Sequence, residues 1–375
     1  MRKLRALILF LFALALAGCS ERPKLLLLNW GEYINEEAVE LFEKEYGIDV
    51  IINIADSNEM FYSKIVSGTT VYDLAIPSEY IIEKMIQKDL LQKFDFSKLT
   101  NYDREENPFL PGVEGILSSM GEGFADYAVP YFWGTFGLMY NKKKAGLEEA
   151  IRGYGWDAFF NPALLPAGTR VGMYDVPRFA YAAALFASGL SPNLESDEAL
   201  RTAEAKLKSV KFTEWGTDTL KKGIAANNLD LAFVYTGDFL DMLYIKLETN
   251  RLEDITFDIY IPEETIAFMD CFIIPKKARH VDAAHLFVDF FLRPEIAYLN
   301  ASVVGYCTPL RASYEMITSY AGDDPWLSSW AYANRKYYPL PEEGAEKQFS
   351  GTPLSNLDKN FLRKINIMVN NVKAG

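Results

Sequence analysis

The chain has 375 residues, half of them hydrophobic, and its 51 acidic against 38 basic side chains give a formal net charge of −13. This length is too great for one ordinary hydrophobic core and favours two. The acidic balance argues against a nucleic-acid partner, which would need basic patches, and is mildly favourable to a cationic ligand. Because the chain has two histidines and no CxxC pattern, we expect no metal centre built from histidine and cysteine.

The N-terminus carries signals of secretion. A basic stretch at residues 1–5 precedes an apolar run at 6–17, which is too short to span a bilayer. The run ends in Leu16-Ala17-Gly18-Cys19, where small residues precede a cysteine as in the cleavage and lipidation signal of bacterial lipoproteins. We therefore predict a lipoprotein signal peptide at residues 1–18 and a lipid on Cys19. The remaining cysteines, Cys271 and Cys307, could pair outside the cytoplasm, and the sequence leaves this open.

Strand and helix signals alternate from residue 24 onward. A helix is expected between Asn35, which can cap it, and Gly47, which can end it, with apolar residues at spacing four in between. The other predicted elements of this region are strands at Lys24–Asn29, 48–54 and 72–77 and helices at Asn58–Ser67 and 80–93. This alternation predicts a largely parallel sheet with helices on both faces.

Residues 94–128 are rich in glycine, proline and polar groups and are predicted to form a long irregular connection. A second alternating region follows them. Its predicted strands lie at 170–174, Leu231–Tyr235, 257–261 and 267–274, and an amphipathic helix is predicted at 280–292, stopped at Pro294. His280 and His285 are expected at the surface.

Residues at or near the carboxyl ends of the predicted strands form the candidate site, because ligands of open α/β sheets bind there. The chemistry there is carried by the aromatic residues Trp30, Tyr33, Tyr80, Tyr235, Phe268 and Tyr306 and the carboxylates Glu32, Asp175, Asp238 and Asp270. Aromatic faces attract ammonium groups and cover methylene chains, and a carboxylate gives each ammonium a charge-assisted hydrogen bond. Carboxylates along an aromatic slot therefore fit a linear polycation with methylene spacers.

Signatures of catalysis are weak. The sequence contains no GxSxG elbow, no P-loop pattern and no HExxH pair. Paired carboxylates could hydrolyse a glycoside, but no local arrangement supports that reaction. We therefore expect a binding protein without a cofactor, and not an enzyme.

Six segments resemble the spermidine/putrescine-binding proteins of bacterial ABC importers, in the family's order and with its spacing. They are 28–33 (LNWGEY), 57–60 (SNEM), 72–80 (YDLAIPSEY), 129–134 (VPYFWG), 268–270 (FMD) and 305–309 (GYCTP), within a resemblance that extends over almost all of residues 24–372. It implies an α/β two-lobe periplasmic-binding-protein fold of type II, with the ligand cleft between the lobes. The implied N-terminal lobe comprises residues 24–128 plus 269–314, and the C-terminal lobe comprises 129–268 plus 315–375.

The resemblance also implies roles for single residues. Trp30, Tyr33 and Tyr80 match aromatic walls of the cleft, and Ser78 matches a cleft serine. Tyr306 matches an aromatic contact near the hinge, and Gln348 matches a polar contact. The carboxylates that bind ammonium groups match Glu32, Asp175 and Asp270. Tyr235 and Phe268 stand where spermidine binders usually have tryptophan. Residues 236–238 resemble the putrescine-preferring branch, in which an aspartate at the position of Asp238 binds an amine of the ligand. The acidic residue that usually follows Asp175 is absent, and Arg178 stands close by.

These features predict a monomeric polyamine-binding lipoprotein, anchored on the periplasmic or cell-surface face of a bacterial membrane, that delivers putrescine or spermidine to an ABC permease. Because Asp238 adds a carboxylate and Arg178 adds a like charge for a terminal ammonium, putrescine is expected to bind at least as tightly as spermidine. The alternatives are a binding protein of the same fold for an amino acid or ferric iron, with Arg178 as the partner of a carboxylate, and an enzyme on a two-lobe fold.

Overall fold

The computed structural model describes residues 22–247, 249–338 and 350–375. The predicted signal peptide at 1–18, Cys19 and Gln348 lie outside the described residues.

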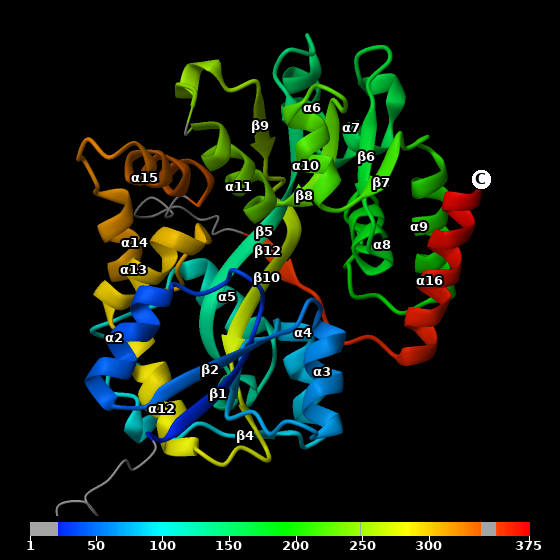
Figure 1. Ribbon diagram of the computed structural model, residues 1–375. Coiled ribbons are helices and arrows are strands. Elements are labelled where there is room, and N and C mark those ends of the chain that lie inside the picture. Colours follow the sequence, from blue (N-terminus) through cyan, green and yellow to red (C-terminus); the bar gives the residue numbers. More distant parts are fainter. Residues whose placement is uncertain (1–21, 248, 339–349) are drawn as a thin grey trace, which may run out of the picture.

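The first part of the chain forms the predicted parallel sheet. Its strands β1 (Lys24–Asn29), β2 (Asp49–Ile54) and β3 (Leu74–Ala75) lie in the order β2-β1-β3 and alternate in sequence with α2 (Glu36–Tyr46), α3 (Asn58–Ser67) and α4 (Glu79–Gln87). In Figure 1, α2 lies at the left of these strands and α3 and α4 lie at their right. Local sequence explains the first helix: the Asn35 side chain accepts a hydrogen bond from the Glu37 amide at 2.8 Å, and Gly47 ends the helix at φ 66.

Three predicted boundaries in this region are wrong. The strand predicted at 72–77 is regular only at Leu74–Ala75, although the amides of Asp73 and Ile76 on either side still donate to carbonyls of β1. The helix predicted at 80–93 ends at Gln87 and is followed by a short strand, β4 (Leu91–Gln92), which pairs with β11 (Ile274–Pro275). The segment 94–128 is not wholly irregular, since it contains α5 (Pro111–Ser119), which buries Val113, Ile116 and Leu117.

A larger sheet occupies the middle of the molecule. Its order is β12-β10-β5-β8-β6-β7, and β9 also pairs with β5. The strands are β5 (Val129–Asn141), β6 (Val171–Tyr174), β7 (Glu214–Gly216), β8 (Leu231–Tyr235), β9 (Phe257–Tyr260), β10 (Glu264–Phe272) and β12 (Ser350–Pro353). Every residue of β5 is buried. The antiparallel pair β5 and β10 runs through the centre of Figure 1 and joins the part around β1 to the part around β6.

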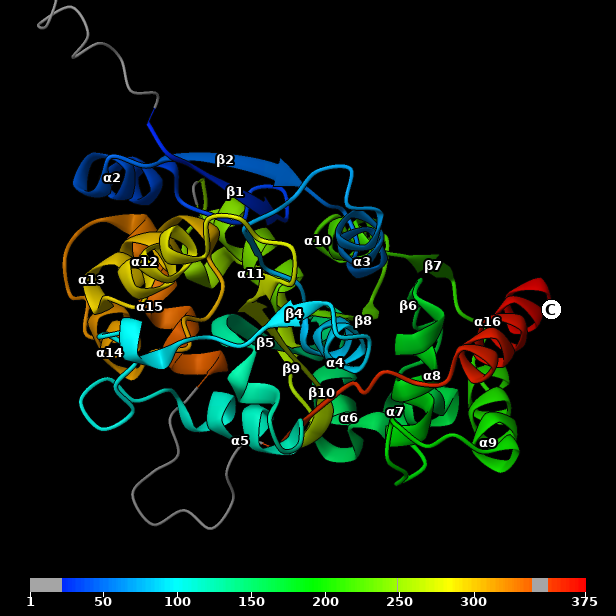
Figure 2. The same cartoon turned by 90° about the horizontal axis from the view of Figure 1, so that it is seen from below.

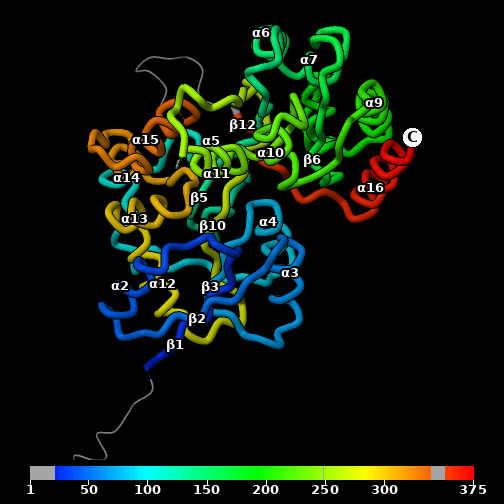
Figure 3. The backbone as a smooth tube through the Cα atoms, turned by 45° about the horizontal axis from the view of Figure 1, so that its top comes forward, coloured from blue at the N-terminus to red at the C-terminus, as the bar shows by residue number. Residues whose placement is uncertain are grey.

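Helices cover this sheet and complete the molecule. They are α6 (Leu147–Tyr154), α7 (Trp156–Phe160), α8 (Pro177–Phe186), α9 (Asp197–Lys208), α10 (Asp218–Ala225), α11 (Thr236–Leu247), α12 (Val281–Phe291), α13 (Pro294–Val304), α14 (Arg311–Thr318), α15 (Pro325–Tyr337) and α16 (Lys359–Ala374). The last helix packs against α8 and α9, and the rings of Phe361 and Tyr181 lie 5.9 Å apart. Figures 2 and 3 show α16 beside α9 from two sides.

Two clusters of buried hydrophobic side chains form, as the length predicts. One surrounds β1–β3 and the helices α4, α5 and α11–α15, and the other lies among β6, β8, α6–α9 and α16. The predicted lobe boundaries fall at the start of β5, inside β10 and inside α14. The division into lobes at these residues stays a prediction.

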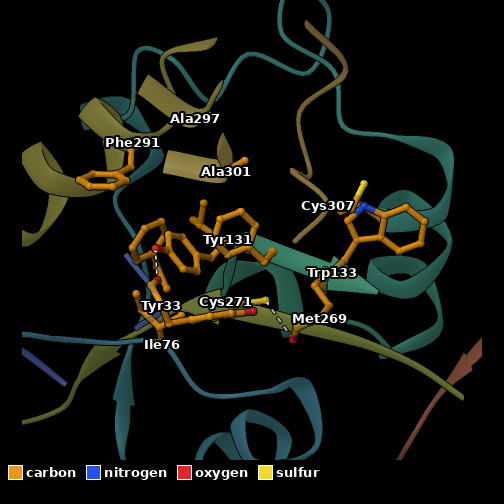
Figure 4. Close-up of a cluster of buried hydrophobic side chains, with 14 of the residues drawn as sticks. Tyr33, Ile76, Tyr131, Trp133, Met269, Cys271, Phe291, Ala297, Ala301 and Cys307 are labelled. Atoms are coloured by element: carbon orange, nitrogen blue, oxygen red, sulfur yellow. Dashed lines mark hydrogen bonds between the residues drawn. The ribbon is translucent and has the colours of Figure 1, made fainter. Parts of the chain in front are cut away.

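Cys271 and Cys307 are both buried free thiols. Figure 4 shows Cys271 on the same strand as Met269 and Cys307 beside the ring of Trp133. His285 contradicts the surface expectation: only 2 % of it is exposed, and its Nε2 accepts a hydrogen bond from the Asp95 amide at 2.9 Å. The side chain of His280 is half-exposed, as expected, beside Asp73. None of the helices in the described ranges is long and apolar enough to cross a membrane.

Candidate functional site

A buried carboxylate, Asp270, lies where β10 passes the carboxyl ends of β1 and β3. Its Oδ1 accepts a hydrogen bond from Ser78 Oγ at 2.6 Å, and its Oδ2 accepts one from the Tyr33 hydroxyl at 2.7 Å. Asn58 holds Ser78 in turn, because its Oδ1 accepts from the Ser78 amide at 2.9 Å and its Nδ2 donates to Ser78 Oγ at 3.0 Å. The structure therefore brings together Tyr33, Ser78 and Asp270, which come from segments far apart in the sequence.

Backbone pairing fixes the position of this carboxylate. Ser78 and Asp270 form an antiparallel bridge, and the Cys271 amide donates to the Pro77 carbonyl at 3.0 Å. The register between β10 and β5 shifts between Asp270 and Cys271, which marks an irregularity of the bulge type. Such irregularities re-aim side chains next to functional sites.

The charge of Asp270 is not balanced by a neighbouring cation. Only 5 % of the residue is exposed, and burial raises the pKa of Asp270 to about 6, although the hydrogen bonds from Ser78 and Tyr33 act to lower it. Among the described residues, no lysine, arginine or histidine forms an ion pair with it. Two neutral hydroxyls therefore hold a carboxylate that burial makes costly to ionise.

A second buried carboxylate, Glu79, lies beside Asp270 and was missed from the sequence. Its Oε2 accepts a hydrogen bond from the Met269 amide at 2.9 Å, and only 1 % of the residue is exposed. Burial, with a smaller contribution from the charge of Asp270, raises the pKa of Glu79 to about 8. Glu79 stands in the first turn of α4, where an acidic residue ordinarily satisfies the helix dipole. Nothing in the local sequence distinguishes it from such a residue.

Four aromatic rings form a continuous row that starts at Asp270. The ring of Tyr33 lies 5.3 Å from that of Tyr306, Tyr306 lies 6.1 Å from Phe268, and Phe268 lies 5.2 Å from Tyr235. The row requires a glycine at 237, because a Cβ there would come within 2.3 Å of the Tyr306 ring. All four rings are predicted site residues, and the structure places them in one cluster with Asp270.

Three other predicted residues lie at the margin of this cluster. Trp30 is half-buried, donates its indole N–H to the Ile76 carbonyl at 2.8 Å and packs on Phe61 at 4.8 Å. Tyr80 is also half-buried, and burial raises its pKa, with smaller contributions from Glu59, Glu79 and Asp270. Glu32 is exposed in the left-handed region at φ 51. Neither Trp30 nor Glu32 is hydrogen-bonded to Asp270.

Asp175 is engaged by a cation of the protein itself. It follows β6, and its carboxylate forms an ion pair with the Lys373 ammonium of α16. The same ammonium lies 5.3 Å from the centre of the Trp215 ring. A carboxylate and an aromatic face thus hold Lys373 in the way that the sequence predicts for a ligand amine.

Asp238 likewise has a lysine partner. It lies in the first turn of α11, and its Oδ1 is 3.4 Å from the Lys221 ammonium of α10. Its Oδ2 is buried and accepts no hydrogen bond from the described part of the chain. Burial raises the pKa of Asp238, and the Lys221 charge opposes that rise.

Arg178 is committed to a neighbouring loop. Its guanidinium donates to the Pro192 carbonyl at 2.9 Å and to Asn193 Oδ1 at 2.6 Å, and burial lowers its pKa to about 10. The sequence left two orientations open, toward the ligand or toward solvent. The structure gives a third, in which the guanidinium contacts the loop after α8.

The parallel β2-β1-β3 sheet, the central mixed sheet and a buried carboxylate between them define an α/β binding protein of the periplasmic type. The sequence pattern described as bacterial extracellular solute-binding protein matches residues 27–298, and the chain belongs to this family. It is therefore a solute-binding protein and not an enzyme, as predicted.

Similar proteins support the same conclusion. The putrescine-binding periplasmic protein SpuD of Pseudomonas aeruginosa is 29 % identical over 356 residues, which cover 90 % of this chain and 94 % of SpuD. The spermidine/putrescine transporter substrate-binding protein PotD of Streptococcus pneumoniae superposes with a TM-score of 0.75 at 28 % identity, covering 94 % of this chain and 99 % of PotD. The TpPotD lipoprotein of Treponema pallidum has a TM-score of 0.69 at 25 % identity, covering 93 % and 99 %. The predicted α/β periplasmic-binding-protein fold is confirmed.

Proposed function

We propose that this protein binds putrescine or spermidine with one ammonium group at Asp270 and delivers it to the permease of an ABC importer. The observation that carries the proposal is the buried Asp270 carboxylate, which has two hydroxyl donors and no cationic partner in the described part of the chain. A ligand ammonium supplies the missing counter-charge. The names of the relatives point to the same class of ligand.

The row of rings suits the remainder of such a ligand. Rings of Tyr306, Phe268 and Tyr235 continue from the Asp270 carboxylate, so that methylene groups extending from the bound ammonium would be covered by aromatic faces. Each buried methylene contributes about 0.8 kcal/mol. An aromatic face adds about 0.5–2 kcal/mol for an ammonium placed over it.

The lobe division bears on how the ligand is retained. Under the proposed boundaries, Tyr33 and Ser78 belong to the N-terminal lobe (24–128 plus 269–314), and Tyr235 belongs to the C-terminal lobe (129–268 plus 315–375). A ligand that contacts both sets stabilises the closed arrangement, and it does so only to the extent that it binds that arrangement more tightly. Closure around the polyamine would present a defined surface to the permease.

An amino acid or ferric iron is less well suited. A carboxylate-bearing ligand needs a free cation, and Arg178 already donates to Pro192 and Asn193. In the described ranges, no group of three or more histidine, cysteine or acidic side chains is arranged to hold a metal ion. The surroundings of Asp270 therefore favour an ammonium ligand over an amino acid and over ferric iron.

The test is calorimetric titration with putrescine, spermidine and an ω-amino acid of similar length, after native mass spectrometry of whatever ligand co-purifies. Asp270→Asn is the test variant, and Asp89→Asn, at an exposed carboxylate paired with Lys276, is the matched control. Polyamine binding that is lost in the first variant and kept in the second supports the proposal. Wild-type protein that binds the amino acid and neither polyamine contradicts it.

We further propose that the protein is held on the membrane by a lipid on Cys19. The support is the sequence 16–19 and the likeness to the TpPotD lipoprotein. Cys19→Ala should move the protein from the detergent phase to the aqueous phase in Triton X-114 extraction. Unchanged partitioning relative to the wild type would rule the anchor out.

A further inference from the structure

A buried lysine, Lys221, lies inside a group of three carboxylates. Its ammonium is 2.7 Å from Asp218, 2.7 Å from Asp241 and 3.4 Å from Asp238, and only 9 % of its side chain is exposed. The three partners hold it in the charged form, so that its pKa is raised despite the opposing effect of burial. Lys221 therefore contributes a permanent ammonium at this place.

Tyr306 connects this lysine group to the Asp270 end of the site. Its ring packs on the Tyr33 ring that carries the Asp270 hydrogen bond, and it also lies directly against Gly237, next to Asp238. Burial raises the pKa of the Tyr306 hydroxyl, and the charges of Asp238 and Asp270 both raise it further. Asp238 and Asp270 thus both lie near the same aromatic side chain.

The two carboxylates differ in what they offer to a ligand. Asp270 has no cation beside it among the residues that the structure describes, whereas Asp238 already faces the Lys221 ammonium with one oxygen. The other oxygen of Asp238 is buried and has no hydrogen-bond partner in residues 22–247, 249–338 and 350–375. A ligand ammonium that reached this second oxygen would lie close to Lys221, at a separation where like charges repel strongly in a partly buried setting.

We propose that Lys221 excludes one further ligand ammonium from the site, because its own ammonium takes the place beside Asp238. This inference rests on the proposed polyamine function and deepens it. The wild type should favour the diamine putrescine over the triamine spermidine, and removal of Lys221 should open the Asp238 end to a further ammonium.

Lys221→Met tests the inference, and Lys222→Met is its matched control. Lys222 is the next residue, but its side chain is 64 % exposed, and its one ion pair within the described ranges is with Asp218. The measurement is the ratio of the spermidine to the putrescine dissociation constant, by calorimetry at constant salt. We expect Lys221→Met to shift this ratio toward spermidine by about tenfold or more, and Lys222→Met to leave it within about threefold. A merely structural role would weaken both ligands together.

Two further variants keep the test decisive. If circular dichroism shows that Lys221→Met is unfolded, Lys221→Gln, which keeps a donor without the charge, is measured against the same criterion. In the wild-type background, Asp238→Asn should change spermidine affinity less than about threefold, because Lys221 already satisfies that carboxylate. A loss of more than about tenfold there, or an unchanged ratio in the Lys221 variants, overturns the inference. If the wild-type protein binds neither putrescine nor spermidine, the result contradicts the proposed polyamine function and not only the role of Lys221.

Discussion

Replacing Asp270 by asparagine should raise the stability of the ligand-free protein at neutral pH and weaken its binding of polyamine. The pKa of this carboxyl is raised by burial from its ordinary value of 3.8 to about 6. A carboxyl with a raised pKa resists ionisation in the folded state. Its ionisation therefore costs nothing below pH 3.8, costs more as the pH rises, and reaches its full cost above pH 6.

The size of the effect follows from the shift. The rise from 3.8 to about 6 corresponds to about 3 kcal/mol at neutral pH. Asparagine removes the charge but offers a single acceptor oxygen to the hydroxyls of Ser78 and Tyr33, at a cost of about 1 kcal/mol. Asp270→Asn should thus gain about 2 kcal/mol of unfolding free energy at pH 7.5 and lose about 1 kcal/mol at pH 3.5.

Binding should respond in the opposite direction. A buried ammonium that loses its charged partner loses about 2–5 kcal/mol, so that polyamine affinity should fall by about 30-fold or more. Urea unfolding at both pH values, without ligand and with saturating putrescine, measures the two effects together, and Asp89→Asn serves as the control. A variant less stable than the wild type at pH 7.5, or one that keeps its affinity within about threefold, would refute the reasoning.

Three further outcomes are expected. Glu79→Gln mimics the protonated form of a carboxyl whose pKa is raised to about 8, so urea unfolding should show it more stable than the wild type at pH 9 and no more stable at pH 4. Putrescine binding near pH 5.5 should release protons, because an ammonium beside Asp270 lowers its pKa; identical binding heats in two buffers of different ionisation enthalpy would contradict this. Lys373→Met removes a partly exposed ion pair with Asp175 and a contact with Trp215, and thermal unfolding should report a loss of about 1 kcal/mol or less.

Local signals explain which elements could be predicted. Asn35 and Gly47 bracket α2 in the sequence as they do in the structure, because a cap and a left-handed glycine act on their immediate neighbours. Helix α5 was missed because it begins with Pro111 and contains Gly112 and Gly115, which lower its helix propensity. Its formation depends on burying one apolar face against the rest of the molecule, and that contact is not local.

The site residues also divide into those that a local sequence rule could predict and those that only tertiary packing brings together. Tyr33 and Ser78 follow predicted strands, so the rule for strand ends could bring them together with Asp270. The lysine partners could not be predicted, because Lys221 and Lys373 meet their carboxylates only through the packing of α10 on α11 and of α16 near β6. Charge balance at such places is a property of tertiary structure, which composition and motifs do not report.

The position of β12 determines which edge of β10 an unfinished chain leaves unpaired. This strand pairs in parallel with β10, on the side of β10 opposite to β5, although it comes from residues 350–353. A chain that emerges from its N-terminus during synthesis or export therefore carries β10 with one bare edge until those residues appear. Unpaired strand edges can pair with other chains, so the exposed edge of β10 is a place where an incomplete chain can aggregate and a chaperone can act. Helix α16, which packs against α8 and α9, comes from the residues after β12 and is absent from such an unfinished chain as well.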